Sequence, residues 1–109
     1  MQALHERPFV PAKKGTPPLT GAALATLTAQ LPNAWTAVDG RLARTYKVAD
    51  FSTALALAVR IGMLAEKLEH HPELTVRWGA LVVTTWTHTV DGLAEGDFVL
   101  AARCDVIAT

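Results

Sequence analysis

Three segments of the chain carry apolar residues at the three- and four-residue spacing of an amphipathic helix. The first is a short helix that begins at the N-cap residue Thr20 and ends at Pro32. The longest begins at Asp50 and should end near His70, because Pro72 disfavours helical geometry in the residue before it. A last helix runs from about Glu95 through the apolar positions Phe98, Leu100, Ala101 and Cys104.

The longest helix is apolar on more than one side. One stripe along it consists of Phe51, Ala54, Leu55, Ala58, Ile61, Ala65 and Leu68. Leu57, Met63 and Leu64 add apolar surface outside that stripe. A helix of a globular domain usually buries a single stripe against its own core. The additional surface therefore predicts a second burial partner, such as another subunit.

Two hairpins are predicted between the helices. In the first, residues 35–38 and 42–48 flank Asp39-Gly40, a sequence that favours a two-residue type I′ turn. This turn pairs Trp35 with Arg44. The residues on the expected core face are then Trp35, Ala37, Leu42, Tyr46 and Val48.

The second hairpin joins residues 73–78 to residues 81–89 around Gly79-Ala80. With that loop, Trp78 pairs with Leu81 and Val76 with Val83, and extrapolation beyond the strands brings His71 opposite His88. One face is then an apolar core face made of Leu74, Val76, Trp78, Leu81 and Val83. The other face is polar, with Trp86 as its aromatic residue.

The order helix, hairpin, helix, hairpin, helix predicts an α+β fold, in which helices pack on one face of a four-stranded antiparallel sheet. The chain has 109 residues, enough for one domain. Residues 1–18 are rich in proline and are expected to form a flexible N-terminal arm. The domain is expected to span residues 19–109.

Composition narrows the classes of function. Ten basic residues balance ten acidic ones, which does not favour direct nucleic-acid binding. No apolar run is long enough to cross a membrane, and the N-terminus lacks the apolar region of a secretory signal. The single cysteine, Cys104, has no partner for an intrachain disulfide and is read as a small buried apolar residue. We therefore expect a cytoplasmic protein.

Histidines are the candidate chemical groups. His70 lies at the end of the long helix, and His71 and His88 lie near the base of the second hairpin. Glu66, one helical turn before His70, is expected to orient its imidazole. Histidine titrates nearest neutral pH, which suits proton transfer. A single histidine is more often structural, and three can also hold zinc, although no HExxH motif or cysteine cluster accompanies these.

A longer pattern connects these residues. The run Glu66-x-x-x-His70-His71-Pro72 is followed at fixed spacings by Trp78, His88 and Asp97. This pattern resembles the signature of the pterin-4a-carbinolamine dehydratases, and the similarity extends over about residues 19–108. The segment WTHTVDGLAEGDFVLAA also looks like bacterial members of that family.

The resemblance implies loss of water from 4a-hydroxytetrahydrobiopterin or a related pterin, with quinonoid dihydropterin as the product. It implies no metal, no organic cofactor and assembly as a homodimer or homotetramer. As a hypothesis for this chemistry, His70 and His71 act as general acid toward the hydroxyl, while His88 holds the pterin and accepts or relays the N5 proton. The remaining candidate site residues, assigned to substrate binding, are Glu66, Glu69, Trp86 and Asp97.

Several of these roles have alternatives. Trp86 either lies against the flat ring of the pterin or serves only as a wall of the site. Asp97 either forms a hydrogen bond to the substrate edge or to His88, or it caps the final helix. Glu69 stands where the family often has Asp, Asn or Gly. Gly96 stands where animal members often have a basic residue.

A second class of function is a protein-binding role. Proteins that resemble this family include a dimerisation cofactor of a transcription factor and assembly factors of RuBisCO in autotrophs. RuBisCO or a hydroxylase is therefore a candidate partner. Retention of His70, His71 and His88 favours the enzyme and leaves the binding role open. A zinc-binding domain is a third hypothesis.

Overall fold

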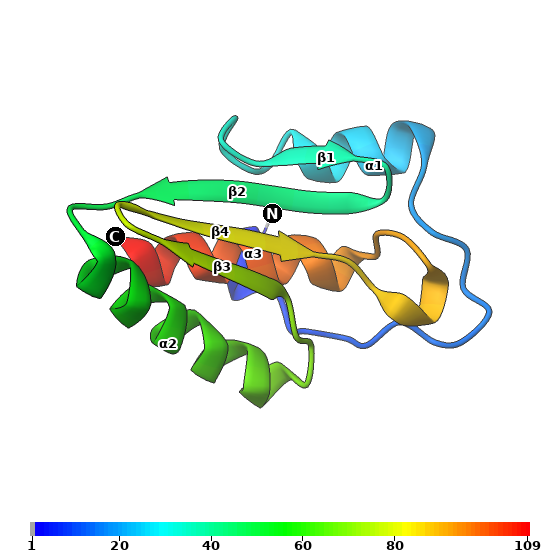
Figure 1. Cartoon of the computed structure of the whole chain (residues 1–109). Coiled ribbons are helices and arrows are strands. Elements are labelled where there is room, and N and C mark those ends of the chain that lie inside the picture. Colours follow the sequence, from blue (N-terminus) through cyan, green and yellow to red (C-terminus); the bar gives the residue numbers. More distant parts are fainter. Residues whose placement is uncertain (1) are drawn as a thin grey trace.

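The computed structural model describes residues 2–109. Four strands form one antiparallel sheet in the order β1-β2-β4-β3, and the helices pack on one face of it (Figure 1). This arrangement confirms the predicted α+β fold class. The elements in chain order are η1 (Leu4–Glu6), α1 (Gly21–Thr28), β1 (Thr36–Val38), β2 (Arg41–Lys47), α2 (Phe51–Leu68), β3 (Glu73–Arg77), β4 (Ala80–Thr85), η2 (His88–Val90) and α3 (Glu95–Ala108), where η marks a 3₁₀ helix.

The first hairpin has the predicted register. Ala37 pairs with Leu42 and Val38 with Arg41. Asp39 and Gly40 both have positive φ angles, 51° and 72°, as a type I′ turn requires. The predicted core face is confirmed at its large residues, since Trp35, Leu42 and Tyr46 are buried.

A hydrogen-bond cluster ties this hairpin to α3. Asp105 of α3 accepts from the indole N–H of Trp35, from Arg44 Nη1 at 2.8 Å and from the hydroxyl of Tyr46. Burial, together with the hydrogen bond to Asp105, raises the pKa of Tyr46 above its usual range. Tyr46 is therefore a neutral donor that helps to fix β2 against α3.

The predicted register of the second hairpin is wrong by two residues. The turn is Trp78-Gly79, so Val76 pairs with Leu81 rather than with Val83. Gly79 has a φ of 77°, which glycine adopts without strain, and this favours its place inside the turn. An even shift keeps every side chain on its predicted face, but Trp78 moves out of the core and is 75% exposed.

Helix α2 begins at its predicted cap. The carboxylate of Asp50 accepts from the backbone N–H and the hydroxyl of Thr53, and these bonds lower the pKa of Asp50. The predicted apolar stripe is only partly buried: Phe51 and Leu55 are exposed, whereas Leu57, expected outside the stripe, is buried. The buried residues of α2 are Ala54, Leu57, Ala58, Ile61 and Ala65.

The N-terminal segment differs from the predicted extended arm. It contains η1, and Leu4 is buried in the core beside α3. Arg103 of α3 donates to the backbone oxygen of Arg7 at 2.6 Å, and Arg7 forms an ion pair of 2.7 Å with Glu95. The prediction of an arm rested on the four prolines of this segment, and prolines give no information about contacts with residues far away in the sequence. The domain boundary at residue 19 remains a prediction.

The final helix contributes much of the core. Phe98, Leu100 and Cys104 are completely buried. Burial raises the pKa of the Cys104 thiol to about 12, which fits its reading as a small apolar residue. Within residues 2–109, no helix combines the length and the apolar character needed to cross a bilayer.

Candidate active site

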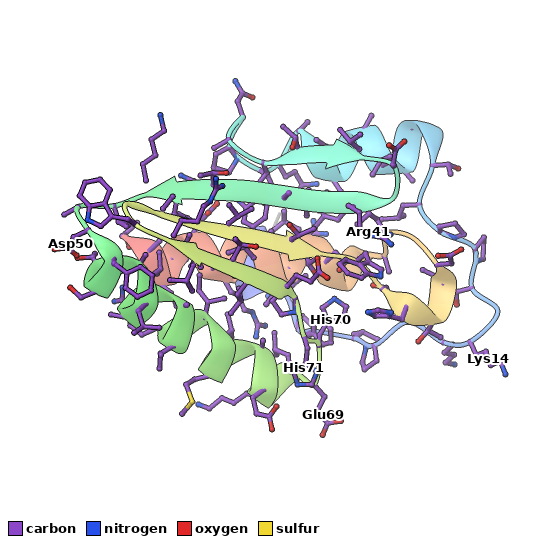
Figure 2. All side chains as sticks on the ribbon, viewed as in Figure 1. Lys14, Arg41, Asp50, Glu69, His70 and His71 are labelled. Atoms are coloured by element: carbon purple, nitrogen blue, oxygen red, sulfur yellow. The ribbon has the colours of Figure 1, made fainter. Side chains whose placement is uncertain are left out.

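Helix α2 ends in a left-handed turn that directs the two following histidines. Glu69 has a φ of 53°, and the N–H of His70 donates to the carbonyl of Ala65 while the N–H of Glu69 donates to that of Glu66. These two bonds form a Schellman motif, a common end of a helix. Figure 2 shows that His70 and His71 follow the end of α2, close to the start of β3.

His70 turns inward and meets a buried carboxylate. Its Nε2 lies 2.7 Å from Oδ1 of Asp97 and 3.1 Å from the hydroxyl of Thr85. The side chain of His70 is 14% exposed and that of Asp97 is 0% exposed. Side chains from β4 and α3 thus converge on the imidazole of His70, which follows the end of α2.

The carboxylate of Asp97 has a full set of donors. Oδ1 accepts from Thr85 and His70, and Oδ2 accepts from the hydroxyl of Thr87 at 2.7 Å and the backbone N–H of Ala94 at 3.0 Å. Four donors match the acceptor capacity of an ionised carboxylate. A buried charge that is bonded in this way is tolerated, whereas an unpaired one is costly.

This network sets the orientation of His70. With Nε2 bonded to Asp97, Nδ1 is the ring nitrogen left to exchange a proton with a substrate. The prediction that Asp97 bonds His88 or the substrate edge is wrong, because Asp97 is fully buried and bonds His70. Its alternative role in capping α3 is confirmed by the bond from Ala94.

His71 faces outward and has its own carboxylate. Its Nε2 lies 2.8 Å from Oε1 of Glu66, and its side chain is 64% exposed. The prediction that Glu66 orients His70 is therefore wrong. The left-handed residue Glu69 breaks the helical relation between positions 66 and 70, so the carboxylate meets the next histidine instead.

His88 lies in η2 beside Trp86. Their ring centroids are 4.9 Å apart with an interplanar angle of 46°. The guanidinium carbon of Arg41 lies 4.0 Å from the centroid of Trp86, a cation–π contact. The prediction that His88 lies opposite His71 in the hairpin fails with the two-residue register error, since His88 lies beyond the last residue of β4.

Arg41 is a site neighbour that sequence reasoning missed. It begins β2, and the pairing of Leu42 with Thr85 brings it to the end of β4. No local signal in the sequence reveals this, because α2 and β3 lie between β2 and β4 along the chain, although the two strands are neighbours in the sheet. Figure 2 shows Arg41 where β2 begins, and His70 and His71 where the chain passes from α2 to β3.

A small cavity of about 110 Å³ lies next to His70. Its lining includes Glu69, Gly96 and four residues of the N-terminal segment, 9–12. Pockets for drug-sized ligands usually measure roughly 300–1,000 Å³, so a bicyclic pterin would have to approach from the exposed side of the histidines. A larger, more open groove of about 640 Å³ lies between η1 and the end of α3, and none of the predicted site residues lines it.

Metal binding was one alternative for the three histidines. Across residues 2–109, no group of three or more His, Cys, Asp or Glu side chains is arranged to hold a metal ion. His70 and His71 each bond a carboxylate instead. In each pair the carboxylate holds Nε2, so Nδ1 is the ring nitrogen without that bond.

Comparison with protein families decides the broader assignment. The model of the family described as pterin 4 alpha carbinolamine dehydratase matches residues 17–107. The chain belongs to this family. Membership in the pterin 4 alpha carbinolamine dehydratase family confirms the resemblance carried by the residues from Glu66 to Asp97.

Curated relatives and a solved structure agree with the family. Two curated relatives carry the name "Putative pterin-4-alpha-carbinolamine dehydratase". The one from Rickettsia bellii (strain OSU 85-389) is 41% identical, over 96% of this chain and 94% of the relative. The one from Rubrobacter xylanophilus is 44% identical, over 96% of this chain and 98% of the relative. A crystal structure described as a transcriptional coactivator/pterin dehydratase from Brucella melitensis is 33% identical. It superposes with a TM-score of 0.78 over 84% of this chain and 99% of that one.

Proposed function

We propose that this protein dehydrates 4a-hydroxytetrahydrobiopterin or a closely related pterin carbinolamine. The observation that carries the proposal is the 2.7 Å contact between His70 and the fully buried Asp97. A buried carboxylate that fixes one ring nitrogen leaves the other oriented for proton transfer, as in other histidine-based sites. Family membership supports the pterin as the substrate class.

The reaction needs two proton transfers. The C4a–O bond breaks and its electron pair leaves with the oxygen, which takes up a proton to depart as water. The lone pair of N5 forms the C4a=N5 double bond, and N5 loses its proton. An acid and a base of near-neutral pKa can assist both events at once.

The three histidines are assigned to these transfers. His70 and His71 act toward the hydroxyl, each held through Nε2 by a carboxylate, Asp97 and Glu66 respectively. His88 holds the pterin and relays the N5 proton, on the exposed surface beside Trp86. Because Arg41 already lies over the ring of Trp86, the role of Trp86 as a wall is favoured over direct stacking with the pterin.

The direct test is the rate of carbinolamine dehydration. The substrate is generated in situ by an aromatic amino acid hydroxylase, and formation of the quinonoid product is followed against the spontaneous rate. We expect the protein to accelerate dehydration and His71→Ala to lower turnover by a factor of roughly 10² to 10⁴. His5→Ala is the matched control, because His5 is exposed in η1 and outside the site. An unchanged rate in His71→Ala would remove His71 from the mechanism.

Assembly and location belong to the same proposal. The exposed apolar residues of α2 support a homodimer or homotetramer in which this helix meets a second copy. We place the protein in the cytoplasm, where its single thiol, Cys104, needs no disulfide partner.

The protein-binding alternative is separated by the same assay. The Brucella melitensis protein is described as a coactivator as well as a dehydratase, so the two roles are named together in that relative. A folded protein that leaves the spontaneous rate unchanged would disprove the dehydratase proposal. A binding role, toward RuBisCO or a hydroxylase, would then be the function to test.

A further inference from the structure

We infer that Phe9 is a positioning residue for His70, held in place by an N-terminal strap, residues 7–12, that forms one wall of the active site. This inference rests on the proposed function. The rings of Phe9 and His70 have centroids 5.4 Å apart and an interplanar angle of 50°. Phe9 is half-buried although it lies in a segment without helix or strand.

The strap is anchored on both sides of Phe9. Before it, Arg7 bonds Glu95 and receives a hydrogen bond from Arg103, both in α3. Beyond the end of the strap, the backbone N–H of Leu19 donates to the carbonyl of Leu93 at 2.8 Å. These contacts hold the intervening residues across the N-terminal end of α3, where Asp97 lies.

Gly96 provides the space that Phe9 occupies. A Cβ atom built on Gly96 would lie 2.6 Å from Cε2 of Phe9 and 3.1 Å from its Cζ. No real Cβ approaches an aromatic carbon so closely, so a side chain at position 96 would displace the ring. Gly96 directly precedes Asp97, and Phe9 therefore packs where the partner of His70 enters α3.

The contact restricts the motion of the catalytic imidazole. Asp97 and Thr85 hold Nε2, but a hydrogen bond at one atom leaves the ring free to tilt about that point. Phe9 packs against the ring itself, and the strap also covers the small cavity beside it. Misplacement of a catalytic group by about 1 Å can cost up to 10²-fold in rate, so this packing bears on turnover rather than on substrate affinity.

The test combines two substitutions that remove the same contact. We expect Phe9→Ala to lower kcat roughly tenfold while KM changes less than about twofold. Phe9→Leu should restore most of the loss, since it refills the space beside His70. Gly96→Ala should match Phe9→Ala although alanine is the better helix former. The double variant should be no worse than either single one, because both remove one contact.

A measurement independent of catalysis accompanies the kinetics. Diethylpyrocarbonate modifies accessible imidazoles, and mass spectrometry follows each histidine separately. We expect His70 to react about fivefold faster in Phe9→Ala and Gly96→Ala than in the parent protein, with unchanged rates at His71 and His88. Lys13→Ala, which alters the exposed residue directly after the strap and outside the cavity, should change neither readout.

The outcomes separate the two proposals. Equal reactivity of His70 in the parent protein and in Phe9→Ala would overturn the shielding by Phe9, and an unchanged kcat would overturn its positioning role. If the parent protein fails to accelerate dehydration, the proposed function falls. The modification rates of His70 would then still decide whether Phe9 packs on its ring.

Discussion

Asp97 has no exposed surface, and four donors surround its carboxylate. One of those donors, the backbone N–H of Ala94, cannot become an acceptor. The imidazole of His70 and the hydroxyl of Thr85 can both reverse their roles. This asymmetry predicts how the site responds when the charge of Asp97 is removed.

We expect Asp97→Asn to inactivate the site while leaving the protein folded. The amide oxygen should stay toward Ala94, so the NH₂ group should face His70 and force its other tautomer. Turnover should fall by a factor of roughly 10² to 10⁴, as when a buried carboxylate that orients a histidine is neutralised. The free energy of unfolding should fall by only about 1–2 kcal/mol, because most hydrogen bonds survive.

Kinetics, urea unfolding and ¹⁵N NMR of the imidazole test this prediction. Thr87→Val is the control, because it removes a donor to Oδ2 of Asp97 without touching His70. It should lower stability by a similar amount and preserve most of the turnover. Turnover of Asp97→Asn within about threefold of the parent protein would show that Asp97 does not set the state of His70.

The packing of Phe9 accounts for glycine at position 96. Position 96, where the resemblance leads us to expect a basic residue in animal members, is glycine here, and the ring of Phe9 fills the adjacent space. The two residues are 87 positions apart in the sequence. Only the structure shows that Gly96 and Phe9 are in contact and that glycine at one position makes room for the ring at the other.

At the scale of an element, the end of α2 explains position 69. Glu69 adopts a left-handed conformation, with a φ of 53°, as the residue that closes the helix. Asp, Asn and Gly, the residues that the family resemblance leads us to expect there, all tolerate this conformation better than Glu. The position is thus constrained by its backbone, whereas the sequence suggested contact with the substrate.

Replacement of Glu69 by glycine distinguishes these two roles. If the backbone is what matters, Glu69→Gly should raise the free energy of unfolding by about 1 kcal/mol, because glycine relieves left-handed strain. KM and kcat should stay within about twofold of the parent values. Thermal unfolding and steady-state kinetics provide both numbers. A clear rise in KM would return Glu69 to the substrate-binding residues.

At the scale of the whole molecule, one side of α2 exposes a row of apolar side chains to solvent. Its exposed apolar row consists of Phe51, Leu55, Val59 and Met63, each between 47% and 68% exposed. Residues four apart lie on one side of a helix, so these side chains form a continuous stripe on a different side from the buried residues. A stripe of this kind is typical of a helix that packs against a partner.

We expect a charge in this stripe to break the assembly. The mass of the parent protein measured by analytical ultracentrifugation should exceed that of a single chain. The mass of Val59→Glu should shift toward that of the monomer, because a charge buried at the interface without a partner is costly. Arg60→Glu adds the same acidic residue one position away, outside the stripe, and should leave the mass unchanged. A parent protein that sediments as a monomer would contradict the proposed assembly.

Local rules determined much of this protein from its sequence. Helical periodicity and the cap at Asp50 located the helices, and Asp39-Gly40 set the first turn and its register. The family pattern from Glu66 to Asp97 pointed to the correct family. The predicted register of the second hairpin was wrong by two residues. Trp78-Gly79 and Gly79-Ala80 are both plausible loops, and both keep the side chains of the strands on the same faces.

Tertiary structure decided which groups act together. The partner of His70 is Asp97 rather than Glu66, and the covering ring comes from Phe9 in a segment that looked like a loose arm. Periodicity, caps and turns act over a few neighbouring residues. Side-chain pairs between α2, β4, α3 and the N-terminal strap depend instead on how the elements pack, and that packing minimises the free energy of the whole chain at once.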